Sequence, residues 1–153
     1  MRTAPLLSVL VTTFDRRDLL VETLRSIVDV VRFPVEVLVG NANVARPIDS
    51  SYTGLAHPSI TYVNHPEQYW AWENTRVLFA RSTGQFVTSI ADDDLFHPAF
   101  FSLFEQAVAA VPALQCLYTS YTSNERVFEH GLSPGIPIQT FTGSEFFDRL
   151  VSQ

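Results

Sequence analysis

Three consecutive carboxylates, Asp92, Asp93 and Asp94, are the residues of this 153-residue sequence best suited to chemistry. Neighbouring carboxylates repel one another, so their clustering is unfavourable unless a cation or a hydrogen-bond network offsets it. Carboxylate oxygens suit hard cations such as magnesium, manganese or calcium, which take their remaining ligands from water or substrate phosphates. The structural alternative is that the triplet forms a turn and caps a helix beginning near Pro98, because Asp is favoured at both positions.

The apolar residues around this triplet alternate between strand-like runs and helix-like spacing. Residues 6–13 form a nearly continuous apolar run, as strands buried on both faces do. Leu20, Leu24, Ile27 and Val31 have the spacing of one helical stripe, which Pro34 would end. The rest of the chain predicts a strand over 35–39, a loop over 41–58, a strand over 60–63, a helix from Trp70 to Gly84, a strand over 86–90, a helix from Pro98 to Val111, a strand over 115–122 and a helix over 142–151.

This alternation favours an α/β fold, with a mostly parallel sheet and helices on both of its faces. Such sheets bind ligands outside the carboxyl ends of their strands. Asp15 follows the first predicted strand, Asn41 and Asn43 follow the second, and Asp92–Asp94 follow the strand over 86–90. The polar candidates are therefore expected at one edge of the sheet.

Composition excludes several classes of function. All ten basic residues are Arg, the net charge is −6 and no basic stripe occurs, so nucleic acid is not an expected partner. The absence of Lys excludes Schiff-base chemistry and the phosphate-loop lysine. The single Cys116 gives no sign of an oxidising compartment, and no apolar run approaches the length of a membrane span, so we expect a cytoplasmic protein. The short apolar segment after Arg2 is better explained as a buried strand than as a signal peptide.

Several known motifs are also missing. No Gly-x-Gly-x-x-Gly follows the first strand, no Gly-x-Ser-x-Gly occurs, and the four His residues do not have metal-ligand spacing. His97 is expected near the start of a helix instead. A phosphoacceptor receiver domain is excluded because it would need a Lys. A haloacid dehalogenase is excluded because its nucleophile motif would lie near the first strand, whereas the Asp triplet follows the strand over 86–90.

Three blocks of the sequence resemble family-two glycosyltransferases. Residues 8–16 (SVLVTTFDR) are similar to the opening of that family, and residues 91–98 (ADDDLFHP) are similar to its Asp-x-Asp region. The middle block lies between them and comprises residues 63–66 (VNHP), Asn74 and residues 80–87 (ARSTGQFV). The resemblance extends over about residues 6–111, with a weaker echo at 143–150. It implies a Rossmann-like GT-A fold, a nucleotide-sugar donor such as a UDP- or dTDP-sugar, and a divalent metal, manganese or magnesium.

The resemblance also implies roles for particular residues. Thr13, Phe14 and Asp15 would line the nucleotide pocket, with Phe14 against the base, although a Phe here also suits a core. Asp93 would bind the metal, while Asp92 would reach the ribose or share the metal. Asp94 would share the metal, cap the following helix or orient the acceptor. For Asn74, a structural hydrogen bond inside the fold is as well supported as a contact with the donor.

The sequence departs from the family pattern at several positions. Ala91 stands where many members have the first Asp, and Asn41 and Asn43 stand where an acidic pair usually reads the base. An Asn can still pair with a uracil or thymine edge, because its amide both donates and accepts. Glu73 replaces a common basic residue. Tyr69, Trp70 and Trp72 crowd a segment that usually bears Gly, where they would narrow the donor site or simply pack.

Length limits the predicted function. We expect residues 1–153 to form a single GT-A-like nucleotide-sugar-binding domain that lacks the acceptor-binding part, since a complete domain needs roughly another hundred residues. The expected reaction is metal-dependent, inverting transfer to an unidentified acceptor, for which a saccharide is a candidate; no general base is assigned. A catalytically silent nucleotide-sugar-binding module is the alternative, and a nucleotidyl transferase is a weaker one. Missing strands would leave an open sheet edge for self-association.

Overall fold

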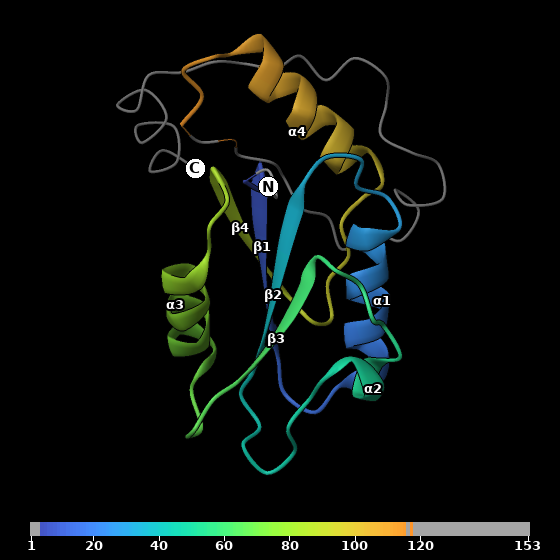
Figure 1. Ribbon diagram of the computed structural model, residues 1–153, viewed down its shortest axis with the longest axis vertical. Helices are drawn as coiled ribbons and strands as arrows, with labels where there is room; N and C mark the ends of the chain where they lie inside the picture. Colours follow the sequence, from blue (N-terminus) through green and yellow to red (C-terminus); the bar gives the residue numbers. More distant parts are fainter. Residues whose placement is uncertain (1–3, 116, 118–153) are drawn as a thin grey trace, which may run out of the picture. The chain divides into compact units, whose positions relative to one another are not determined.

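The structure is a computed structural model that describes residues 4–115 and 117 (Figure 1). The chain forms two compact units that divide after Ser102, and each is considered by itself. The first unit contains the sheet and every candidate site residue. The description of the second is confined to the end of one helix and the few residues that follow it.

A four-stranded parallel sheet organises the first unit, as the alternating sequence pattern predicts. Its strands lie in the order β3-β2-β1-β4. Every neighbouring pair is parallel, so all four carboxyl ends lie at one edge. The strands are β1 (Leu7–Thr13), β2 (Val35–Asn41), β3 (Ile60–Asn64) and β4 (Phe86–Ala91).

Helices cover both faces of this sheet. The helix α3 (Ala71–Arg81) lies on one side of the strands, while α1 (Arg17–Val28) and the short α2 (Ser50–Thr53) lie on the other (Figure 1). Right-handed crossovers explain the two sides. The chain moves from β1 to β2 in one direction across the sheet and returns from β3 to β4 in the other, so the connecting helices fall on opposite faces.

Apolar burial is greatest in the two central strands. Leu7, Val9, Leu10 and Val11 of β1 are at most 1% exposed, as expected for a strand with neighbours on both edges and helices on both faces. On the α3 side, the core joins all four strands to the helix through Leu10, Leu38, Val63, Leu78 and the partly buried Val87. The core therefore fixes the strand ends that carry the polar candidates.

Some predicted boundaries differ from the structure. Leu20, Leu24 and Ile27 are fully buried on α1, but that helix ends at Val28, so Val31 lies beyond it. The predicted loop over 41–58 contains α2, a single turn too short to show a period in the sequence, which Asp49 caps through its side chain. The helix predicted from Pro98 to Val111 corresponds to α4 (Ala99–Ala110), which begins one residue after Pro98.

Two further elements are not tested. The predicted strand over 115–122 lies almost entirely outside the described residues, and the predicted helix over 142–151 lies wholly outside them. Within the described part of the chain, no helix combines the length and the apolar character needed to cross a membrane.

A carboxylate ties three strands together at the edge opposite the candidate site. Glu36 of β2 accepts hydrogen bonds from the Ser8 hydroxyl of β1 (2.6 Å) and from the Thr83 backbone N–H (2.9 Å) and hydroxyl (3.0 Å), just before β4. The Ser8 hydroxyl oxygen in turn accepts from the Gly84 N–H at 2.8 Å. Charged acceptors of this kind give the stronger class of protein hydrogen bonds.

We expect Glu36→Ala to lower the free energy of unfolding by about 2 kcal/mol, because it removes a charged acceptor and leaves the Ser8 hydroxyl without its acceptor. Urea denaturation followed by circular dichroism measures the loss. Ligand binding by the folded variant should equal that of the wild type, since the clamp lies at the opposite strand ends. A loss of binding without a loss of stability would contradict this assignment.

Candidate functional site

The carboxyl edge of the sheet gathers the predicted site residues. Thr13 at the end of β1 pairs in register with Asn41 at the end of β2, and Asn41 pairs with Asn64 at the end of β3. On the other side of β1, Thr12 is paired with Ala91, the last residue of β4. Asp92 therefore leaves the sheet directly beside Thr13, although the two are 79 residues apart.

Asp92 is the centre of the polar network on this edge. It is fully buried, and its Oδ2 accepts hydrogen bonds from the Thr13 hydroxyl (2.6 Å) and from Arg16 Nε (3.3 Å). Arg16 Nη2 donates to the other oxygen, Oδ1. Both oxygens of this carboxylate thus have protein partners, which offsets the loss of hydration on burial.

Asp93 shares the same guanidinium but remains accessible. Arg16 Nη1 donates to Asp93 Oδ2 at 2.7 Å, and the Asp93 and Arg16 side chains are 45% and 46% exposed. Partial desolvation acts to lower the pKa of Arg16, but the carboxylates of Asp92 and Asp93 outweigh it and raise that pKa. Arg16 is therefore a permanent cation between the two carboxylates.

Asp94 takes part through its backbone. Its N–H closes a turn onto the Ala91 carbonyl at 3.3 Å, and its carbonyl accepts from the buried Thr23 hydroxyl at 2.8 Å. The same hydroxyl donates to the Asp92 carbonyl at 3.0 Å, which fixes the turn to α1. The predicted turn is confirmed, but capping by Asp94 is wrong: the start of α4 is capped by His97, whose Nδ1 accepts from the Ala99 N–H at 3.1 Å.

The asparagine at the end of β2 holds the next loop in place. Asn41 is 1% exposed, and its amide nitrogen donates to the backbone carbonyls of Asn43 and Arg46 and to Asn64 Oδ1, at 2.8–3.0 Å. Its oxygen accepts from the Asn43 N–H at 3.0 Å. Asn43 is partly exposed, with Oδ1 accepting from the Ala45 N–H. In this arrangement Asn41 shapes the loop, and Asn43 is the more accessible of the two.

Asp15 stands in a backbone conformation that few residues other than glycine adopt. Its φ of +55° places it in the left-handed region, which Asp tolerates better than most residues. Its two carboxylate oxygens both accept from Arg46 Nη1 at 3.0 Å. A positive φ directly after a central strand marks a turn held in place by its surroundings, as is common at functional sites.

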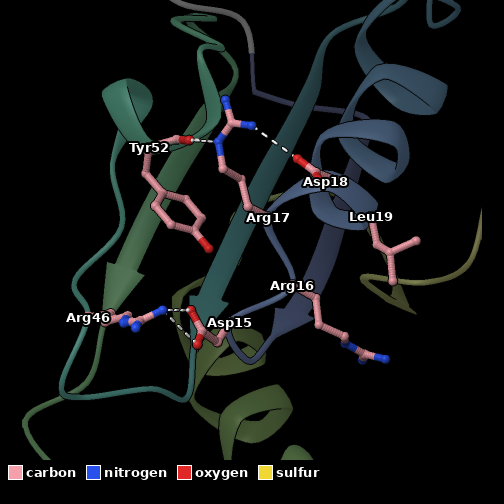
Figure 2. Close-up of a pocket in the computed structure, with 7 residues that line it drawn as sticks. All are labelled: Asp15, Arg16, Arg17, Asp18, Leu19, Arg46 and Tyr52. Atoms are coloured by element: carbon pink, nitrogen blue, oxygen red, sulfur yellow. Dashed lines mark hydrogen bonds and ion pairs between the residues drawn. The ribbon is translucent and has the colours of Figure 1, made fainter.

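Beside Asp15 lies an open pocket of about 510 Å³, shown in Figure 2. In this view Arg46 faces Asp15, while the Arg16 side chain points away from that pair. Arg17 Nε donates to the Tyr52 carbonyl at 2.5 Å, and its Nη1 donates to Asp18 at 3.0 Å. The lining residues are Asp15, Arg16, Arg17, Asp18, Leu19, Arg46 and Tyr52.

The aromatic candidates are exposed. Phe14 is 48% exposed, so the alternative that it belongs to the core is wrong. Trp70 and Trp72 are 78% and 65% exposed, so simple packing does not explain them either, whereas Tyr69 packs its ring at 4.7 Å from that of His65. Glu73, in place of a basic residue, accepts from the Trp70 N–H at 2.9 Å and so caps α3.

Asn74 lies inside the fold. It is fully buried on α3, and its amide nitrogen donates to the Gly40 carbonyl at 2.8 Å. Its oxygen accepts from His65 Nε2 at 2.7 Å, which places a proton on that nitrogen. Both ends of the amide are used, as the structural alternative expects. A contact with a sugar donor stays a prediction.

The three aspartates do not converge on one point. Among residues 4–115 and 117, no group of three or more His, Cys, Asp or Glu side chains is placed to hold a metal ion together. Three further residues of this edge, Arg16, Arg46 and Thr23, were not predicted from the sequence. The signal for Arg16 was present: three adjacent carboxylates in a chain without Lys require a guanidinium or an added cation.

No protein-family model matches the chain, and no curated protein sequence is similar enough to count as a match. Solved structures do share its fold. TarS of S. aureus superimposes with a TM-score of 0.56 at 18% identity, and the match covers 68% of this chain and 32% of TarS. The structure of TarS in complex with UDP-GlcNAc superimposes with a TM-score of 0.55 at 17% identity, and that match covers 68% of this chain and 31% of TarS.

A mannosyltransferase of Pyrobaculum calidifontis, solved with GDP-Man and Mn2+, matches with a TM-score of 0.50 at 23% identity over 61% of this chain and 29% of its own. The chain thus spans about a third of the length of these proteins. Its α/β architecture with an all-parallel sheet is shared with part of each of these structures, in agreement with the GT-A-like fold that the resemblance implied.

Proposed function

We propose that this chain is the donor-binding part of a glycosyltransferase that moves a sugar from a nucleotide-diphosphate sugar to an acceptor hydroxyl with inversion. The observation that carries the proposal is the meeting of Thr13, Asp15, Asn41, Asp92 and Asp93 at one sheet edge. Ligands bind at this edge in parallel α/β sheets. The fold is shared with glycosyltransferases solved with UDP-GlcNAc and GDP-Man, which supports the same class of donor.

The accessible groups of the edge suggest how a donor would bind. The half-exposed Phe14 ring offers a surface on which a base can stack. Asn43 is accessible and presents an amide that can pair with a uracil or thymine edge, so a UDP- or dTDP-sugar is the proposed donor. Asp92, fixed by Thr13 and Arg16, would face the ribose or share a metal ion.

A divalent cation, manganese or magnesium, belongs to the proposal. Two carboxylates that already share one cationic group suit a hard cation in the same place, and Asp93 remains accessible to it. Asp93 is the proposed principal ligand, with Asp92 and Asp94 beside it. A metal bound there would stabilise the charge on the departing nucleoside diphosphate. We assign no general base, and the acceptor remains an unidentified hydroxyl compound, such as a saccharide.

Titration calorimetry of the full chain with UDP, dTDP and GDP, with and without Mn2+, tests the donor site. We expect UDP or dTDP to bind only with Mn2+, and Asp93→Ala to weaken this binding at least tenfold, a typical loss for a metal ligand. Asp29→Ala, at the exposed end of α1, is the matched control and should bind as the wild type. Binding that is unaffected by both Mn2+ and Asp93→Ala would remove the metal from the proposal.

A catalytically silent module of the same fold is the second candidate. One observation favours it: protein donors occupy both oxygens of Asp92. Both candidates predict donor binding, so release of UDP from a UDP-sugar in the presence of an acceptor distinguishes them. Binding without turnover in this assay would favour the silent module.

The remaining predictions rest on the sequence. We also propose that residues 1–153 form one donor-binding domain and that the protein is located in the cytoplasm. Self-association is part of the proposal too: within the described sheet, β3 and β4 each have one neighbouring strand, and an edge of that kind can pair with another chain.

A further inference from the structure

The Arg16 guanidinium lies between the carboxylates of Asp92 and Asp93 and is bonded to both. Its Nε and Nη2 donate to the two oxygens of Asp92, and its Nη1 donates to Asp93. One planar cation thereby bridges two adjacent carboxylates through three N–H groups. The fixed fork of an arginine makes such bidentate contacts stronger and more directional than those of a point charge.

This bridge supplies charge compensation inside the fold. Asp92 is fully buried, and within residues 4–115 Arg16 is the one cationic side chain paired with it. A buried carboxylate without a partner is strongly unfavourable, so the chain carries its own counter-ion. Because the Arg16 side chain is 46% exposed and is attached just before α1, it can leave the carboxylates for solvent without unfolding the sheet.

We propose that Arg16 is a tethered counter-ion that competes with the divalent metal for Asp92 and Asp93. This inference rests on the metal site of the proposed function. A guanidinium and a divalent cation on the same carboxylate oxygens repel each other at short range. Metal binding is therefore expected to displace the guanidinium, and the free energy of the hydrogen bonds that are lost is subtracted from the affinity for the metal.

Binding of Mn2+ alone to the full chain tests the competition. Free Mn2+ is followed by electron paramagnetic resonance, without any nucleotide, for the wild type, Arg16→Gln and Arg16→Lys. Arg16→Gln should bind Mn2+ about tenfold more tightly or better, a coupling in the usual range between two sites. Arg16→Lys should lie between the two, because its ammonium keeps the charge but loses the fork.

The control is Arg17→Gln, which removes the same charge from the next residue. Arg17 contacts Asp18 and the Tyr52 carbonyl rather than the two central carboxylates. Its variant should bind Mn2+ as the wild type does, so any general effect of net charge is separated from the specific exchange. Thermal unfolding gives an independent readout: Mn2+ should raise the Tm of Arg16→Gln more than that of the wild type, since tighter ligands stabilise more.

Each outcome decides the matter. Mn2+ affinity in Arg16→Gln that is equal to or weaker than in the wild type overturns the competition and leaves the proposed function intact. An equal gain in Arg17→Gln overturns it as well. If none of the wild type, Arg16→Lys and Arg16→Gln binds Mn2+, the competition fails, and nucleotide titration without metal then shows whether the donor site survives. If Arg16→Gln unfolds without metal, the Arg16→Lys comparison alone must show tighter binding.

Discussion

Replacing Gly40 by alanine is expected to lower the free energy of unfolding by about 4 kcal/mol, from overpacking and from broken buried hydrogen bonds. A Cβ at this position would lie 2.0 Å from Asn74 Oδ1 and 2.9 Å from Leu78 Cδ1. Asn74 cannot move aside freely, because it is fully buried and bonded to the Gly40 carbonyl and to His65. Urea denaturation followed by circular dichroism measures the loss.

Gly54→Ala is the matched control for this substitution. Gly54 has φ +71°, but nothing lies within 4 Å of the Cβ position, so the cost is the conformational one alone, about 1 kcal/mol. A second check is Asn74→Ala in the Gly40→Ala background, whose effect should be much less than additive because the two changes disrupt one network. Equal losses for Gly40→Ala and Gly54→Ala would show that helix α3 shifts to make room.

Asp92→Ala should cost about 3 kcal/mol, whereas the same change at Asp93 should cost less than about 1 kcal/mol. The two residues are neighbours and share Arg16, but Asp92 is buried and bonded to Thr13 whereas Asp93 is exposed. Removing the Asp92 carboxylate leaves the buried Thr13 hydroxyl without its acceptor and removes the side-chain bond that links the end of β4 to that of β1. Asp93 is exposed, and its ion pair is screened by water.

Chemical denaturation of both variants without added metal checks this difference. Asp92→Asn is a useful third variant, because it keeps the volume and an acceptor for Thr13 while removing the charge. It should lose less stability than Asp92→Ala. Similar losses at positions 92 and 93 would contradict the assignment of Asp92 as the structural member of the pair.

The sequence could predict the edge at which the polar residues meet. A long apolar run such as that of β1 indicates a central strand, and alternation with helical stripes indicates parallel strands whose carboxyl ends coincide. Asp15, Asn41 and Asp92 each follow such a run, so their common edge is confirmed without any knowledge of side-chain positions. The position of this edge follows from the hydrophobic periods of the strands and helices and from their alternation along the chain, both of which can be recognised in short stretches of sequence.

The contacts within that edge could not be predicted in the same way. Arg16 reaches Asp92 and Asp93 across 76 and 77 residues, and this pairing depends on the register of β1 with β4 and on how the side chain is directed. Asn74 likewise finds Gly40 only once α3 has packed on β2. The helix α2 was not predicted because a single turn is too short to show a hydrophobic repeat. Asp49 before two Ser residues is nevertheless a capping signal.

Asp93 and the exposed aromatic residues show a different limit. The sequence shows which chemical groups these side chains carry, but it does not show how accessible they are. Trp70 and Trp72 are of a residue type that usually lies in a core, yet both are exposed. Burial is decided by the whole fold rather than by residue type.

The central position of β1 has a consequence for how the chain is made. β1 is synthesised first and can pair with β2 early, but its other edge is completed by β4, the last strand of the described sheet. At ribosomal rates of roughly 5–20 residues per second, the roughly fifty residues between Asn41 and Ala91 take several seconds to emerge. During that time a highly apolar strand has an open edge. We therefore expect the nascent chain to depend on chaperones most in this interval, before translation reaches Phe86.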